Sequence, residues 1–145
     1  MRRFAIALVC AIFCAAPVTL GGDAAKEAKL LDGNWTPISG ELSGRPFPTD
    51  TLRTIKLVIS GNKYTVTVGE QTDKGRLDIY ATKKPKAMDI VGTEGPNQGK
   101  TFVAIYEADA KMLRICYDLE GKQRPTEFKT KEGTQQFLVT YRRGK

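Results

Sequence analysis

The sequence of 145 residues contains no histidine, the side chain most often used as a general base at neutral pH and a common zinc ligand. The serines Ser39, Ser43 and Ser60 therefore have no evident activating partner, and no pair of carboxylates stands out. We predict a protein that is not an enzyme, with no catalytic residue, no metal site and no cofactor.

Cysteine is scarce, with three residues in the chain. If the N-terminal segment is removed, Cys10 and Cys14 leave with it, and Cys116 cannot form an internal disulfide. Without a histidine to activate its thiol, Cys116 is predicted to be a small packed side chain within a strand. Lipid attachment at the first two cysteines is disfavoured because bulky Val9 and Phe13 precede them.

An apolar run long enough to span a membrane is also missing. Residues 1–16 contain two arginines, an apolar run and then small residues, which is the order of a secretory signal peptide. A transmembrane helix needs roughly 20 apolar residues, and Pro17 and the pair Gly21-Gly22 interrupt this run. We predict a signal peptide over 1–22 and one domain over 23–145. The domain is expected to be exported to the periplasm or beyond the cell, without membrane insertion once the leader is removed.

The segment 94–101, EGPNQGKT, comes close to a phosphate-binding P-loop. The motif requires a glycine at position 94, where the chain has Glu94, and Gly95 comes one residue too late. The residues that follow are β-branched and aromatic and predict a strand, whereas a P-loop opens a helix. The segment is therefore predicted to be a turn between two strands.

Basic residues exceed acidic ones, 23 to 16. Two of the basic residues lie in the leader, so the exported domain keeps an excess of about five positive charges. This excess favours anionic partners such as acidic polysaccharide, lipid headgroups or nucleic acid, and an exported protein rarely meets nucleic acid. The basic residues are scattered along the sequence, which is typical of a solvated surface rather than a binding stripe.

Alternating apolar residues dominate the rest of the chain and predict short strands. Segment 52–60 places Ile55, Leu57 and Ile59 on one face, and a Gly61-Asn62 turn leads into a second alternating strand. Further strands are predicted near 35–42 and beginning at residues 76, 86, 101, 112 and 136. About eight strands with short turns favour an all-β, up-and-down antiparallel barrel over a sandwich, because closure removes exposed edges. A short helix or tether is expected over 23–31.

Several motifs occur in the order found in a known family. They are LDGNW at 31–35, KKPKAMDI at 83–90, GKTFVAIYE at 99–107, LRICYD at 113–118 and RPTEF at 124–128. In this the chain resembles the lipocalin-like domain of small exported planctomycete proteins, which have no assigned activity. The resemblance implies the barrel and its export. It also implies that Gly33 opens the first strand and that Trp35 plugs the closed end, with Arg142 or Arg143 stacked on the indole.

Binding residues are sought around RPTEF, where Pro125 fixes the backbone and presents Arg124. In one interpretation Arg124 captures a ligand carboxylate or phosphate together with Lys84, Lys86 and Tyr106. In the favoured one it forms a structural ion pair with Glu127, Glu107 or Asp89. Asp89 itself faces either a ligand or solvent, since strand alternation turns it away from Met88 and Ile90. The candidate ligand-binding residues are Arg124, Tyr106, Asp89 and Lys86, and the structural ones are Gly33, Trp35, Arg142 and Pro125.

Two functions fit these patterns, and the oligomeric state is left open. The first is an exported, non-enzymatic barrel that binds a small apolar or amphipathic ligand. The alternative is an envelope structural or protein-interaction module whose interior is filled by side chains. An eight-stranded barrel allows either, and an apolar cavity of roughly 300 Å³ or more would favour the first.

Overall fold

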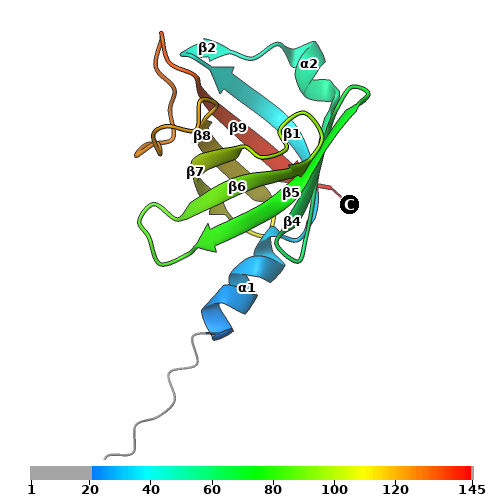
Figure 1. Ribbon diagram of the computed structural model, residues 1–145, viewed down its shortest axis with the longest axis vertical. Coiled ribbons are helices and arrows are strands. Elements are labelled where there is room, and N and C mark those ends of the chain that lie inside the picture. The colour runs from blue at the N-terminus through cyan, green and yellow to red at the C-terminus, as the bar shows by residue number, and fades with distance from the viewer. Residues whose placement is uncertain (1–20, 145) are drawn as a thin grey trace, which may run out of the picture.

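Eight antiparallel strands close into a barrel in this computed structural model, which describes residues 21–144 (Figure 1). The barrel strands are β1 (Gly33–Leu42), β3 (Ile55–Ser60), β4 (Lys63–Val68), β5 (Gln71–Tyr80), β6 (Ala87–Glu94), β7 (Thr101–Ala108), β8 (Met112–Asp118) and β9 (Gln136–Arg143). The remaining elements are α1 (Gly21–Leu31), α2 (Thr49–Arg53) and the two-residue strand β2 (Arg45–Pro46). The predicted all-β barrel with a short N-terminal helix is confirmed. Apart from Gly21 and Gly22, which begin α1, the predicted signal peptide lies outside the described residues.

Consecutive strands pair in order from β3 to β9, and β1 closes the barrel. The first three residues of β1 pair with β3, and its residues from Trp35 to Leu42 pair with Phe137–Arg143 of β9. The register shifts between Pro37 and Ser39, which leaves Ile38 exposed at a bulge. No helix among residues 21–144 has the length and apolar character needed to cross a membrane.

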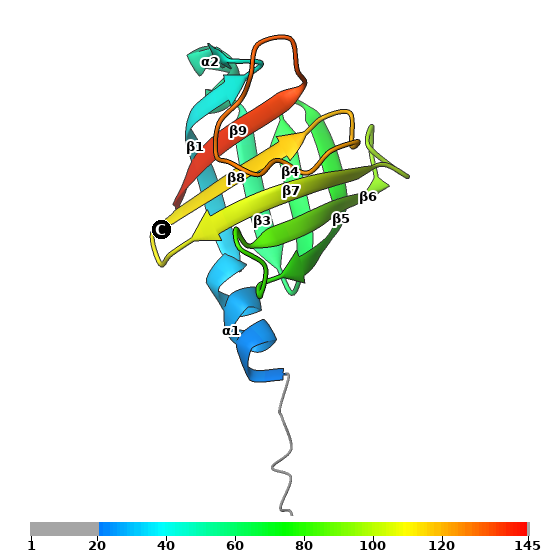
Figure 2. The same ribbon diagram turned by 90° about the vertical axis from the view of Figure 1, so that its left-hand side faces the viewer.

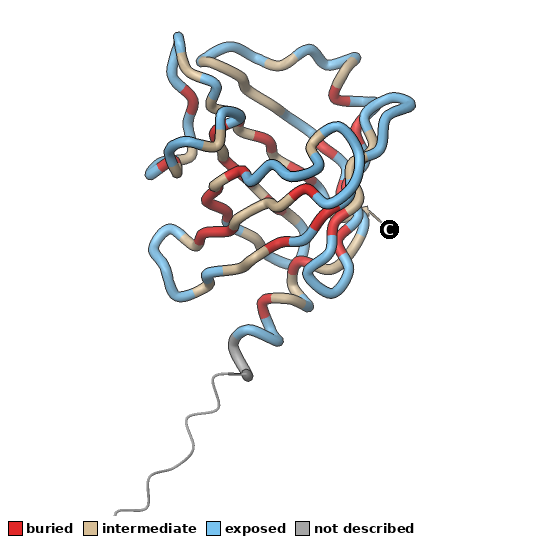
Figure 3. Tube along the Cα trace, in the orientation of Figure 1, coloured by how far each residue is buried: buried red, intermediate tan, exposed pale blue. Residues whose placement is uncertain are grey.

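The alternation read from the sequence sets which side chains enter the barrel. Ile55, Leu57 and Ile59 are buried, and the residues between them are exposed. The β3–β4 turn follows from its two residues, because Gly61 and Asn62 both have positive φ, as a tight hairpin turn requires. Figure 3 shows the resulting alternation of buried and exposed residues along the strands.

Two boundaries differ from the prediction. Residues 49–53, expected to be partly strand, form α2, and β3 begins at Ile55. Segment 69–75 was expected to be a turn, but β5 begins at Gln71, so that only Gly69 and Glu70 connect it to β4. Residues 71–74 are polar, so the start of β5 shows no apolar alternation in the sequence. This part of the strand extends toward solvent, where such alternation is not needed.

Different elements cover the two ends of the barrel. We call the end at which α1 meets the barrel the closed end; it also carries the β3–β4, β5–β6 and β7–β8 turns (Figure 1). The opposite, open end carries the β4–β5 and β6–β7 turns and the β1–β2–α2 segment.

A long connection, residues 119–135 between β8 and β9, contains no helix or strand and crosses the outer wall of the barrel (Figure 2). We call it the strap. Beneath it lies a row of outward-facing buried residues, Ala87, Ile105 and Cys116, which are paired neighbours on β6, β7 and β8. Burial raises the pKa of the Cys116 thiol to about 11, and the Sγ atom donates to the Lys129 carbonyl. Cys116 is therefore a packed strand residue, as predicted, and the strap supplies the packing.

Candidate functional site

The closed end is sealed by Trp35, whose side chain is 1% exposed. The indole Nε1 donates to the Leu31 carbonyl at 2.9 Å, which ties α1 to β1. The guanidinium of Arg143 lies 4.2 Å from the indole ring and also donates to the carbonyls of Asp32, Leu30 and Ala110. The predicted plug and its cation–π contact are present.

The cation on the indole is Arg143, so the choice of Arg142 is wrong. Strand alternation explains the difference: Tyr141 faces the core, and Arg143 shares its side of β9, whereas Arg142 is exposed. Gly33 is explained as well. It has a φ of 144°, and a Cβ atom there would meet the Arg143 Nη1 atom at 2.5 Å.

Two of the predicted ligand-binding residues bind a carboxylate of the chain itself. Glu27 of α1 is 7% exposed, accepts a hydrogen bond from the Tyr106 hydroxyl at 2.7 Å, and pairs with the Lys86 Nζ atom at 3.0 Å. Burial, reinforced by the hydrogen bond to Glu27, raises the pKa of Tyr106 far above its ordinary value. Lys86 and Tyr106 thus anchor the helix, and this cluster is not free to take a ligand.

The other two candidates form an ion pair on the outer wall. The Arg124 Nη2 atom donates to the Asp89 carboxylate at 2.6 Å, and its Nη1 atom donates to the Met88 and Ala104 carbonyls at 2.9 and 2.8 Å. Asp89 also accepts from the Tyr80 hydroxyl at 3.1 Å. The structural interpretation of Arg124, with Asp89 as its partner, describes this geometry. Buried Pro125 beside it holds the strap against the wall.

We expect that Arg124→Lys loosens the strap, because an ammonium group cannot reproduce a planar fork that reaches two carbonyls and a carboxylate. The predicted loss is about 1–2 kcal/mol in the free energy of unfolding, with faster amide hydrogen exchange confined to residues 119–135. The matched control is Arg45→Lys, which makes the same change at an exposed pair with Glu132. Equal effects of the two substitutions would contradict this role for Arg124.

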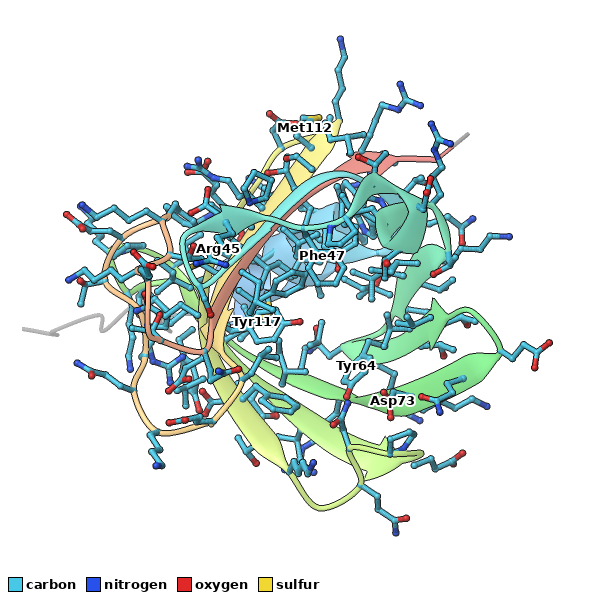
Figure 4. All side chains as sticks on the ribbon, turned by 90° about the horizontal axis from the view of Figure 1, so that it is seen from above. Arg45, Phe47, Tyr64, Asp73, Met112 and Tyr117 are labelled. Atoms are coloured by element: carbon cyan, nitrogen blue, oxygen red, sulfur yellow. The ribbon has the colours of Figure 1, made fainter. Side chains whose placement is uncertain are left out.

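At the open end the interior is hollow. A deep apolar cavity of about 70 Å³ lies next to a wider mouth of about 300 Å³, and some side chains line both. We call the cavity and the mouth together the cup. Both share the side chains of Tyr64, Val66, Ile90 and Tyr117. The deep part is also lined by Leu57, Ile59, Leu77, Ile115 and Tyr141, and the mouth by Asn97, Lys100, Phe102 and Leu119. In Figure 4, which looks onto the open end, Tyr64 and Tyr117 extend from their strands toward the middle of the barrel.

Aromatic rings form one side of the mouth. Phe47 packs edge-on against Phe137 at 5.2 Å between centroids, Phe137 against Tyr117 at 5.5 Å, and Tyr117 against Phe102 at 6.0 Å. Contacts of this geometry stabilise the ring positions beyond simple burial. The rim of the cup is therefore a connected, preorganised wall.

Glycine and aspartate shape the other side. A Cβ atom on Gly75 would lie 2.6 Å from the Tyr64 ring, so the glycine lets that ring fold over β5. The Asp73 carboxylate accepts from the Asn97 backbone N–H at 3.0 Å and from its side-chain amide at 2.9 Å. These bonds fix the β6–β7 turn at the mouth. The near P-loop segment is thus a rim turn, as predicted.

Three phenol hydroxyls face the cup, those of Tyr64, Tyr117 and Tyr141. None of them bonds to another group among residues 24–144, and none is a fully buried unpaired atom, so solvent or a ligand can reach them. Burial raises the pKa of all three above the ordinary value, so each hydroxyl stays protonated at neutral pH and can both donate and accept. The cup therefore combines apolar walls with three hydrogen-bonding groups.

The structure does not bring the four sequence-predicted binding residues into this cup. Tyr106 and Lys86 hold α1, while Arg124 and Asp89 lie on the outer wall. The aromatic residues that line the cup were visible as alternating strand positions, but alternation does not distinguish a packed ring from a cavity wall. The sequence signal that could have indicated the cup is the presence of Tyr64, Tyr117 and Tyr141 at inward-facing strand positions, where aliphatic residues would fill a packed core. No group of three or more cysteine, aspartate or glutamate side chains within residues 21–144 is placed to hold a metal ion.

No family model, curated protein or solved structure matches this chain. The resemblance to the lipocalin-like domain stays a prediction, and the function is argued from the geometry of the cup.

Proposed function

We propose that the protein is an exported, non-enzymatic barrel that binds a small apolar or amphipathic ligand in the cup. The observation that carries this proposal is the combination of an apolar cavity at the open end with three phenols that have no partner among the described residues. Such a cavity, with few convergent polar groups, is typical of small-molecule sites. The deep apolar part alone measures about 70 Å³, and the cup reaches about 300 Å³ only at its mouth, where Asn97 and Lys100 also line it, so it suits a ligand that extends out of the barrel.

The shape of the cup restricts the ligand. Below it, the interior is occupied by Trp35, Leu31, Met88, Leu113 and Tyr106, each at most 1% exposed. The ligand therefore places a narrow apolar end in the deep part, within reach of the phenols, and leaves its wider end at the mouth. There Lys100 and Asn97 can bind a polar or anionic group.

The alternative, an interaction module with a filled interior, is supported by this same packed lower half. It differs from the ligand-binding proposal only at the open end. The two are therefore separated by measuring whether a small molecule occupies the cup.

The first test is native mass spectrometry of the protein purified from its own host, in which we expect a retained small molecule. A variant test uses the fluorescent probe 1-anilinonaphthalene-8-sulfonate. We expect Val66→Trp, which fills the cup with an indole, to weaken probe binding by about tenfold or more, since a bulky group displaces the ligand from a preformed cavity.

The matched control is Val58→Trp, which adds the same ring on the exposed face of the neighbouring strand β3. It should leave probe affinity within about twofold. If the protein retains no molecule and the two tryptophan variants bind the probe equally, the cup is not a ligand site and the filled-interior module is favoured.

A further inference from the structure

The fold gathers positive charge at the closed end, although the basic residues are scattered in the sequence. Seven cationic side chains of α1, β4, β9 and the β5–β6 and β7–β8 turns are exposed there: Lys26, Lys29, Lys63, Lys83, Lys84, Lys111 and Arg142. They come from segments far apart in the chain that meet around α1 (Figure 1). Basic residues that are scattered along the sequence thus lie on one end of the fold, which their spacing in the sequence did not indicate.

These seven cations make no salt bridge among residues 24–144, the part of the chain whose side chains the structure describes. Carboxylates at the same end are engaged elsewhere: Glu27 binds Lys86, Asp32 accepts from the Gly61 N–H, and Asp109 accepts from the Lys111 and Met112 N–H groups. Bonds from N–H groups do not neutralise Asp32 and Asp109, but the seven cations outnumber the carboxylates left without a basic partner, so the closed end presents a net positive charge to solvent.

The open end is different because carboxylates there offset the cations. Lys56, Lys74, Lys100 and Lys131 make no salt bridge within the described part of the chain, but Glu70, Asp73, Glu94 and Asp118 lie at the same end. Salt bridges at this end join Arg45 to Glu132, Arg53 to Asp50 and Lys122 to Glu120, at 3.4–3.7 Å. A net positive charge at one end and a near balance of charges at the other give the barrel an electrical polarity along its axis.

We propose that the closed end docks on an anionic lipid surface. The cations are spread around an end face rather than along a groove, which fits a flat partner with distributed negative charge better than a single polymer strand. This choice of partner rests on the export in the proposed function: residues 1–20, which include the apolar run, precede α1 in the chain, and a leader engaged with a bilayer would hold this end toward it. Docking in this orientation turns the cup, at the opposite end, away from the membrane.

Electrostatic docking of this kind has a predictable size. Each lysine or arginine close to an anionic membrane strengthens binding severalfold, and the attraction decays over a Debye length. Reversing three such charges should therefore weaken binding by about tenfold or more.

The test is cosedimentation of the full chain with vesicles of phosphatidylcholine, with or without about one third phosphatidylglycerol. We expect partitioning onto the anionic vesicles that is at least about tenfold stronger and that falls as ionic strength rises from about 0.05 to 0.5 M. The variant K63E/K84E/K111E, with one change near each of three closed-end turns, should lose about tenfold or more of this binding. The milder K63Q/K84Q/K111Q should lie between it and the wild type.

The matched control is K56E/K74E/K131E. It makes the same change in net charge at exposed lysines that also lack salt bridges, but these lie toward the open end. It should keep binding within about twofold of the wild type. Equal loss in both triple variants would overturn the proposal, because overall charge would then decide binding. Equal partitioning onto both kinds of vesicle would also overturn it, as would a preference for soluble heparin over anionic vesicles. Probe binding to the cup is measured without vesicles, so failure of this proposal and failure of the proposed ligand site are distinguishable.

Discussion

Replacing Trp35 by alanine should lower the free energy of unfolding by about 3–5 kcal/mol, the largest effect of any single substitution predicted for this chain. The indole is 1% exposed, and its removal leaves a cavity at the bottom of the barrel. It also removes the hydrogen bond to Leu31 and the ring on which Arg143 stacks. The loss thus combines burial, one hydrogen bond and a cation–π contact.

Equilibrium unfolding in urea, followed by circular dichroism, measures this change. Ile38→Ala is the control on the same strand, because Ile38 is 50% exposed at the β1 bulge and should cost less than about 0.5 kcal/mol. A loss under about 1 kcal/mol for Trp35→Ala would mean that the indole does not seal the barrel.

Trp35 also illustrates what the sequence can predict. The strand pattern and the order of turns determine a closed antiparallel meander, because alternation assigns an inner face and closure leaves no edge. Alternation also distinguishes Arg143 from Arg142, once the register of β9 with Tyr141 inward is known. The alternation of β9 was therefore visible in the sequence. Choosing between the two arginines also required knowing which face of β9 points into the barrel.

Lys86 shows the limit of such prediction. The favoured interpretation of Arg124, an ion pair with a carboxylate such as Asp89, describes the structure, but Lys86 was considered only as a partner of Arg124 around an anion, and it binds Glu27 of α1. Lys86 and Glu27 are 59 positions apart. Their pairing depends on how α1 seats under the barrel, and no local pattern carries that information. The same holds for the positive closed end, which the fold assembles from separate segments.

The Glu27 cluster supports the second large prediction. Glu27→Ala should lower the free energy of unfolding by about 2–4 kcal/mol, because it leaves the buried Tyr106 hydroxyl without its acceptor and Lys86 without its counter-charge. The Lys86 side chain is 40% exposed, so solvent screens the lost ion pair and most of the cost comes from the tyrosine. Glu27→Gln keeps an oxygen for Tyr106 and should cost about half as much.

A double-mutant cycle with Tyr106→Phe tests this cause directly. If the hydroxyl is penalised because its acceptor is missing, removing it should cost stability in the wild type and little or nothing in the Glu27→Ala background. Lys26→Ala, one residue away on the exposed face of α1, controls for general changes in the helix. An identical cost of Tyr106→Phe in both backgrounds would show that the two groups are not coupled. The helix would then be held by Leu31 and Trp35, and the Glu27 carboxylate would contribute little to stability.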